Sequence, residues 1–120
     1  MFGKPKTRDL TPGDVAALLQ DRRIVLVDVR EPAEFAAERI HGALNFPLST
    51  FDPGALPAGG DRQVVLQCGS GKRSAMAVER CRAEDVAVDA HLAGGITAWK
   101  GARLPTISFD PASGAILDVR

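Results

Sequence analysis

The sequence has few cysteines and no excess of charge, and each scarcity excludes a class of protein. Only Cys68 and Cys81 carry thiols among 120 residues. Two cysteines are too few for a disulfide framework, so each thiol has to be interpreted from its surroundings. Lysine and arginine together number 15 and balance 15 acidic residues. No net field therefore favours nucleic acid, and we expect no nucleic-acid partner.

Long apolar runs are also missing. Runs such as Ile24–Val27 are far too short to span a membrane, and the first six residues contain charges but no apolar signal core. We therefore expect a cytoplasmic protein without membrane contact. Since 45% of the residues are hydrophobic, the chain can bury one modest core, and one domain is the expectation.

Helical and strand patterns alternate along the chain. Thr11 and Pro12 form a cap and first-turn pair before an apolar helical pattern, and two apolar runs without alternation are typical of buried parallel strands. The expected helices cover residues 12–20, 31–38, 74–84 and a short stretch around Trp99; the expected strands cover 24–29, 43–46, 63–67 and 86–92. This order predicts an α/β domain with a mainly parallel sheet flanked by helices.

Cys68 is the candidate nucleophile. It lies between the strand predicted to end at Gln67 and the helix predicted to begin near Ser74, where open α/β sheets bind ligands. The intervening glycines allow a tight loop whose amides point inward, and the helix dipole adds positive potential. A thiolate should be stabilised there, close to Lys72 and Arg73. The plainer alternative is that Cys68 is a small buried apolar residue in an ordinary loop.

The other chemically notable residues favour structural interpretations. Cys81 has the helical spacing of a core residue and lies too far along its helix for an easy disulfide with Cys68. His41 and His91 have no ligand cluster at metal spacing, so we expect surface or core packing and no metal. Trp99 is expected to anchor the core with its indole nitrogen bonded.

Three separated segments resemble the rhodanese family in order and approximate spacing. They are residues 28–35 (DVREPAEF) continued by 39–48 (RIHGALNFPL), residues 68–74 (CGSGKRS), and residues 94–99 (GGITAW). The resemblance implies a three-layer rhodanese-like domain over residues 1–105, followed by a C-terminal extension of unknown role over 106–120.

The resemblance also implies a thiosulfate sulfurtransferase without a cofactor. Cys68 would carry a sulfane sulfur as a persulfide, and the loop residues would bind the donor and the persulfide: Gly69, Ser70, Gly71, Lys72, Arg73 and Ser74. Apart from the resemblance, Asp28 and Arg30 end a strand near the expected pocket, which favours a supporting role in orienting the loop or holding the substrate; a structural ion pair with Glu34 is the alternative. The expected partners are a small-molecule sulfur donor and a cyanide or thiol acceptor, with a protein acceptor as a further option.

The chain departs from the family pattern at three places. Gly69 replaces an arginine often found after the cysteine, His41 stands where proline is frequent, and no glycine follows the helix at Glu84 and Asp85. Two other functions stay open: a protein-specific sulfur carrier or binding module, and a cysteine phosphatase or arsenate reductase. Phosphatases of this type resemble Cys-x5-Arg, whereas only four residues separate Cys68 from Arg73.

Overall fold

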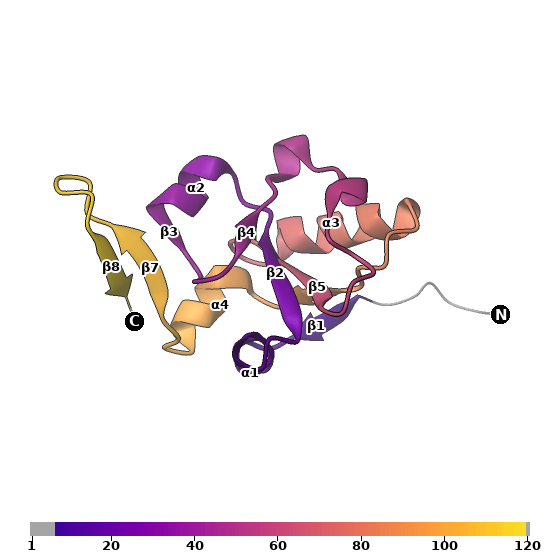
Figure 1. Cartoon of the computed structure of the whole chain (residues 1–120), viewed down its shortest axis with the longest axis horizontal. Coiled ribbons are helices and arrows are strands. Elements are labelled where there is room, and N and C mark those ends of the chain that lie inside the picture. The colour runs from indigo at the N-terminus through magenta and orange to yellow at the C-terminus, as the bar shows by residue number, and fades with distance from the viewer. Residues whose placement is uncertain (1–6, 120) are drawn as a thin grey trace.

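The structure, a computed structural model, describes residues 7–119. Its centre is a five-stranded parallel sheet in the order β1-β6-β5-β2-β4 (Figure 1). The strands are β1 (Arg8–Leu10), β2 (Ile24–Asp28), β4 (Leu44–Asn45), β5 (Gln63–Gln67) and β6 (Ala90–Leu92). The helices are α1 (Pro12–Gln20), α2 (Pro32–Ala37), α3 (Lys72–Ala83) and α4 (Gly95–Gly101), with 3-10 turns η1 (Leu48–Thr50) and η2 (Pro53–Ala55). This arrangement confirms the predicted fold class.

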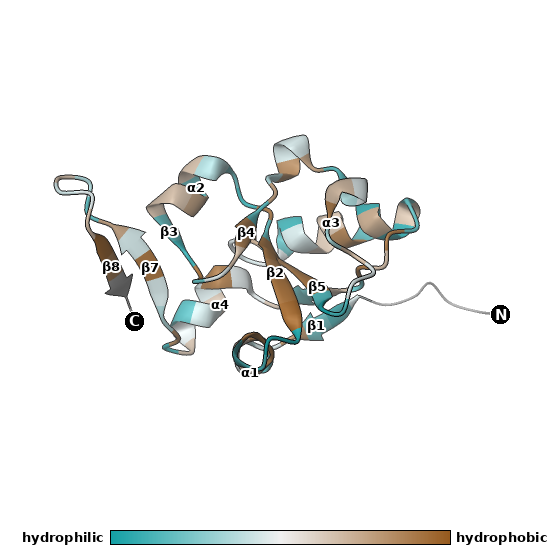
Figure 2. Ribbon diagram, viewed as in Figure 1, coloured by the Kyte–Doolittle hydropathy of each residue, from teal (hydrophilic) through white to brown (hydrophobic). Residues whose placement is uncertain are grey.

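The two faces of the sheet bury separate apolar clusters. On one face α1 and α4 contribute Val15, Ile96 and Trp99 to a cluster with strand residues such as Leu26 and Val65. On the other face α3 packs Ala77, Val78 and Cys81 against another set of strand residues, together with Phe51 and Leu56 from the η1–η2 segment. The interior strand β2 is strongly apolar up to its last residue, Asp28 (Figure 2). These layers place the ends of β5 and β6 between α3 and α4.

Local signals fix several element boundaries. The Thr11 hydroxyl accepts from the Asp14 amide while the Asp14 carboxylate accepts from the Thr11 amide, which is a complete capping box before α1. The predicted strand 63–67 coincides with β5. The helix expected from Ser74 begins two residues earlier, at Lys72, because Gly71 adopts the left-handed conformation before it (φ +102°).

The strand expected over 86–92 is wrong in its first half. After α3 the chain reverses through Asp85, whose φ of +56° is left-handed, at the place where the family pattern has a glycine. The amide of Val86 bonds back to the Cys81 carbonyl, and the amide of Val88 bonds to the Val86 carbonyl. These turn bonds replace strand pairing, so only Ala90–Leu92 forms β6. The three-residue edge strand β1 was not among the predicted strands.

The last described residues form a hairpin at one end of the molecule (Figure 1). Its strands are β7 (Thr106–Phe109) and β8 (Ile116–Val119), and β7 pairs antiparallel with β3 (Glu38–Arg39). The guanidinium of Arg39 lies 4.9 Å from the ring centroids of both Phe35 and Phe109, which ties the hairpin to α2. No helix in the described part of the chain has the length and apolar character of a membrane span.

Candidate functional site

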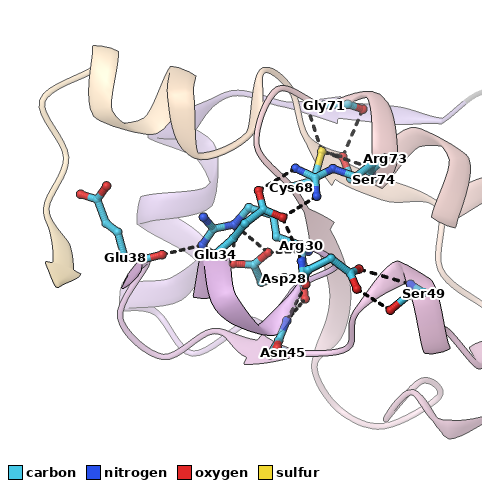
Figure 3. A network of polar contacts seen from close by, with 11 residues as sticks. Asp28, Arg30, Glu34, Glu38, Asn45, Ser49, Cys68, Gly71, Arg73 and Ser74 are labelled. Carbon is cyan, nitrogen blue, oxygen red and sulfur yellow. Dashed lines mark hydrogen bonds and ion pairs between the residues drawn. The ribbon is translucent and has the colours of Figure 1, made fainter. Parts of the chain in front are cut away.

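The loop from Cys68 to Ser74 connects β5 to α3 at the carboxyl end of the parallel strands, as the sequence predicted. Three groups of this loop surround the Cys68 sulfur (Figure 3). The amide of Gly71 is 3.1 Å and the amide of Ser74 is 3.3 Å from Cys68 Sγ, and the Ser74 hydroxyl is 3.5 Å from it. Cys68 itself is fully buried. The loop is therefore a cup of hydrogen-bond donors centred on a sulfur atom.

Helix α4 determines the orientation of the peptide groups in this cup. Its first amides, from Ile96 and Thr97, donate to the carbonyls of Cys68 and Gly69 at 2.9 and 3.1 Å. Because these two carbonyls point towards α4, the amides that follow them in the loop can face the sulfur. The contact is so close that a Cβ at Gly95 would lie 2.6 Å from the Gly69 oxygen and closer still to the Cys68 oxygen. Glycine at position 95 is therefore a requirement of the loop, as well as of its own φ of +59°.

The cup favours the ionised thiol. Burial raises the pKa of Cys68, but hydrogen bonds from the Ser74 hydroxyl and from the amides of Ser74, Gly71 and Ser70 outweigh burial and lower the pKa below its ordinary value of 9.0. A thiolate is the nucleophilic form of cysteine. The geometry thus prepares Cys68 for attack on an electrophile and for holding an anion afterwards.

The two cations of the loop differ in their surroundings. Lys72 is exposed. Arg73 forms a two-point ion pair with Glu34 of α2, at 2.6 and 3.0 Å, and both side chains remain over one third exposed. Bonding to Arg73 holds the pKa of Glu34 at about 2, and the same bond raises the pKa of Arg73. The guanidinium also lies over Gly69, where an added Cβ would be 3.1 Å from one of its nitrogens.

Asp28 and Arg30 form a buried ion pair with each other, so the predicted alternative pair with Glu34 is wrong. The Arg30 guanidinium donates to Asp28 at 2.7 to 3.1 Å and to the Glu38 carbonyl at 2.6 Å. The Asn45 amide donates to the backbone carbonyls of Asp28 and Arg30. As Figure 3 shows, these contacts lie beside the Glu34–Arg73 pair. They link β2, β4 and β3 in the region next to the Cys68 loop.

Three other residues singled out in the sequence have structural surroundings. Cys81 is free and fully buried in the core beneath α3, and burial raises the pKa of its thiol to about 11. The Trp99 indole donates to the Pro105 carbonyl at 2.8 Å, which confirms the predicted core anchor. His41 is exposed and lines a groove of about 520 Å³. That groove is lined by the amino-terminal half of β2 and by Leu44, and no residue of the Cys68 loop lines it.

Sequence reasoning missed the connection of His91 to the cup. His91 of β6 is 6% exposed, and its Nδ1 lies 2.7 Å from the Ser74 hydroxyl. Its Nε2 lies 2.8 Å from the carboxylate of Asp9, its register partner on β1. The available signal in the sequence was a polar residue, His91, within a predicted strand. The structure shows that all three residues of β6 are buried.

The fold and the loop thus define an α/β domain in which a cysteine lies at the centre of an anion-binding loop between a strand and a helix. A family model described as the rhodanese-like domain matches residues 11–102. The chain belongs to the rhodanese-like domain family, as its three sequence segments predicted.

Relatives and solved structures agree with this assignment. The chain is similar to an uncharacterized protein of Synechocystis sp., with 40% identity over 90% of this chain and 60% of the relative. It is also similar to a protein named sulfurtransferase from Allochromatium vinosum, with 35% identity over 71% of this chain and 79% of the relative. The chain therefore spans less than two thirds of the Synechocystis protein.

Two solved structures bear on the choice of function. A thiosulfate sulfurtransferase from Pseudomonas aeruginosa superposes with a TM-score of 0.71 at 28% identity, covering 87% of this chain and 20% of that one. A Rhodopseudomonas palustris protein, described as a possible tyrosine phosphatase, superposes with a TM-score of 0.69 at 26% identity, covering 82% and 83%. The fold is thus shared by proteins whose descriptions name different activities.

Proposed function

We propose that this domain is a sulfurtransferase that accepts a sulfane sulfur on Cys68 and passes it to a second nucleophile. The observation that carries the proposal is the ring of donors around Cys68 Sγ, with the amides of Gly71 and Ser74 at 3.1 and 3.3 Å. The similarity to proteins named sulfurtransferase supports it.

The reaction consists of two exchange steps at sulfur. With thiosulfate as donor, the Cys68 thiolate attacks the outer sulfur, the bond between that sulfur and the sulfonate breaks, and sulfite leaves with the electron pair. Cys68 then carries a persulfide anion. Cyanide or a thiolate attacks the terminal sulfur, forms thiocyanate or a new persulfide, and regenerates the Cys68 thiolate. Both forms of Cys68 carry one negative charge, so the same amides can stabilise each of them.

The cations at the mouth of the loop suit an anionic donor. Lys72 is exposed, and Arg73 keeps a partly exposed guanidinium although Glu34 shares it. We expect Arg73→Ala mainly to weaken capture of thiosulfate, seen as a higher KM with a smaller change in kcat, because it removes a charged donor group. Equal losses in kcat and kcat/KM would instead indicate that Arg73 interacts with the substrate only in the transition state.

The direct test is the mass of the protein after incubation with thiosulfate in the absence of reducing agent. The proposal requires one added sulfur atom, located on the Cys68 peptide and released by cyanide as thiocyanate. Cys68→Ser should take up no sulfur, and Cys81→Ala, the matched control at the other thiol, should load like the wild type. Sulfur uptake by Cys68→Ser, or none by the wild type from thiosulfate or from a persulfidated protein donor, would contradict the proposal.

Two alternatives can be separated in the same preparation. A protein-specific sulfur carrier would load from a persulfidated protein and turn over slowly with thiosulfate and cyanide. A cysteine phosphatase or arsenate reductase would act on a tetrahedral oxyanion. The loop disfavours the latter, because only four residues separate Cys68 from Arg73 and the amides of Gly71 and Ser74 already converge on one sulfur atom. If the wild type hydrolyses a phosphate ester and Cys68→Ser does not, the result would favour a phosphatase.

A further inference from the structure

A continuous chain of polar side chains leads from the Cys68 sulfur to the far edge of the sheet. It runs from Cys68 Sγ to Ser74 Oγ (3.5 Å), from Ser74 Oγ to His91 Nδ1 (2.7 Å), and from His91 Nε2 to Asp9 Oδ1 (2.8 Å). The first three residues are buried, while the Asp9 carboxylate is 69% exposed. Strand register supports the chain, because Asp9 and His91 are direct partners in the β1–β6 pair.

The chemistry of the end groups fixes the direction of the hydrogen bonds. The Asp9 carboxylate only accepts, so His91 Nε2 carries a proton and donates it. In a neutral imidazole the other nitrogen, Nδ1, is then an acceptor. The Ser74 hydroxyl lies 2.7 Å from it and 3.2 Å from the Gly71 carbonyl, which already accepts from the Ala75 amide, so the hydroxyl donates to Nδ1. The Ser74 oxygen is left to accept, and the Cys68 thiol is a donor within reach. Each donor in this arrangement is directed away from Cys68 and towards Asp9.

We propose that His91 is a positioning residue that receives the Cys68 proton through the Ser74 hydroxyl, while Asp9 stabilises the resulting imidazolium. The S–H proton of Cys68 passes to Ser74 Oγ as the hydroxyl proton of Ser74 passes to His91 Nδ1. A neutral thiol and a neutral imidazole become a thiolate and an imidazolium, and no other reactant is needed. Because Ser74 then carries the former thiol proton, its hydroxyl donates to the thiolate and completes the ring of amides.

Other charged groups around His91 are paired elsewhere. Arg8 of β1 pairs with Asp89, the residue before β6. From the helices packed against β6, Arg73 of α3 pairs with Glu34 and Lys100 of α4 pairs with Glu38, while Lys72 of α3 is exposed. Asp9 is the charged group within hydrogen-bond distance of the imidazole among the described residues. The inference rests on the proposed role of Cys68 as nucleophile, but it can be tested without any sulfur donor.

The test is the pH titration of thiolate ultraviolet absorbance. The chain contains no tyrosine, whose ionisation would overlap, and a Cys81→Ala background leaves Cys68 as the single thiol. His91→Gln retains hydrogen-bonding groups but cannot take up a proton, so we expect the Cys68 midpoint to rise by about one unit, with about tenfold less thiolate below it. Ser74→Ala should raise the midpoint too, and His91→Gln should add nothing further in the Ser74→Ala background.

Asp9→Asn keeps the test decisive if the buried variants fold poorly, since this side chain is largely exposed. It should raise the midpoint, because the imidazolium loses its counter-charge. Asp89→Asn is the matched control: it removes the same charge at the residue before β6, where Asp89 contacts Arg8 and Gln63. Unchanged midpoints in folded His91→Gln and Asp9→Asn, or a His91→Gln effect that persists without the Ser74 hydroxyl, would overturn the relay. Because no sulfur is transferred, these results are independent of whether Cys68 accepts sulfur from thiosulfate.

Discussion

Substitution of Gly95 by alanine tests whether α4 shapes the sulfur cup. The new methyl group would lie 2.6 Å from the Gly69 carbonyl oxygen and 2.7 Å from its carbonyl carbon. Since ordinary carbon–oxygen contacts begin at about 3.3 Å, the loop backbone has to move by roughly 1 Å. These neighbours are main-chain atoms, so no side chain can rotate away to relieve the contact.

The cost of Gly95→Ala follows from two effects. Overpacking in a tight site lowers the free energy of unfolding by about 1–3 kcal/mol, and a non-glycine residue at a φ of +59° adds about 1–2 kcal/mol. We therefore expect a loss of about 2–5 kcal/mol. A displacement of about 1 Å at the reacting group can lower the rate of transfer about 100-fold, so sulfur loading should fall more than stability alone explains.

Urea unfolding and the rate of sulfur loading measure the two consequences separately. Gly101→Ala, at the last residue of the same helix, is the control because nothing outside the adjacent residues and the helix's own backbone lies within 4 Å of the added methyl group. That variant should fold at least as stably as the wild type, since alanine favours the helix. If Gly95→Ala matched Gly101→Ala in both measurements, the inferred contact between α4 and the loop would be refuted.

Three further outcomes concern the ion pairs and the second thiol. The bond to Arg73 holds the pKa of Glu34 at about 2, so the pair contributes stability above about pH 4.5 that is lost as the pH falls towards 2. In urea unfolding across that pH range, the free energy of unfolding should fall less for Glu34→Gln than for the wild type. The difference should be modest because both side chains are partly exposed. Asp28→Asn leaves the Arg30 guanidinium buried without its carboxylate and should lower the free energy of unfolding by about 3–5 kcal/mol; a change below about 1 kcal/mol would count against the pair. Cys81→Ala should cost about 1 kcal/mol in the same assay and leave sulfur transfer unchanged, whereas a large activity loss with an intact fold would reveal a redox role.

The elements that sequence predicted well are those with strong local signals. The cap at Thr11 and Asp14 is complete within four residues, and the apolar run 63–67 is long enough to define β5 by itself. The half-strand 86–89 failed because alternation of Val86 and Val88 also suits a turn that buries the same apolar atoms. The edge strand β1 has no apolar pattern, because only Leu10 of its three residues is buried and its place in the sheet comes from pairing with β6, which lies far along the chain.

The candidate site was predictable only in part, for a related reason. Cys68 and its loop are consecutive residues, so their chemistry is visible in one short segment. The partner of Arg73 lies 39 positions away, and Asp9 lies 82 positions from His91. Strand order and register bring these residues together, and neither follows from spacing along the chain.

The distribution of charge around Cys68 explains how a chain without net charge can favour an anion at one point. Arg73 is shared with Glu34 and Arg30 is bonded to Asp28, so two nearby cations are largely neutralised by carboxylates. The groups that contact the sulfur directly are instead amides and the Ser74 hydroxyl. Amides fixed in the loop need no counterion and would not have to reorganise on going from the thiolate to the proposed persulfide, which is the advantage of preorganised donors. Selectivity for the reacting sulfur should therefore depend more on loop length and on Gly95 than on the identity of the exposed side chains, and this is consistent with glycine at position 69, where arginine is frequent in the family.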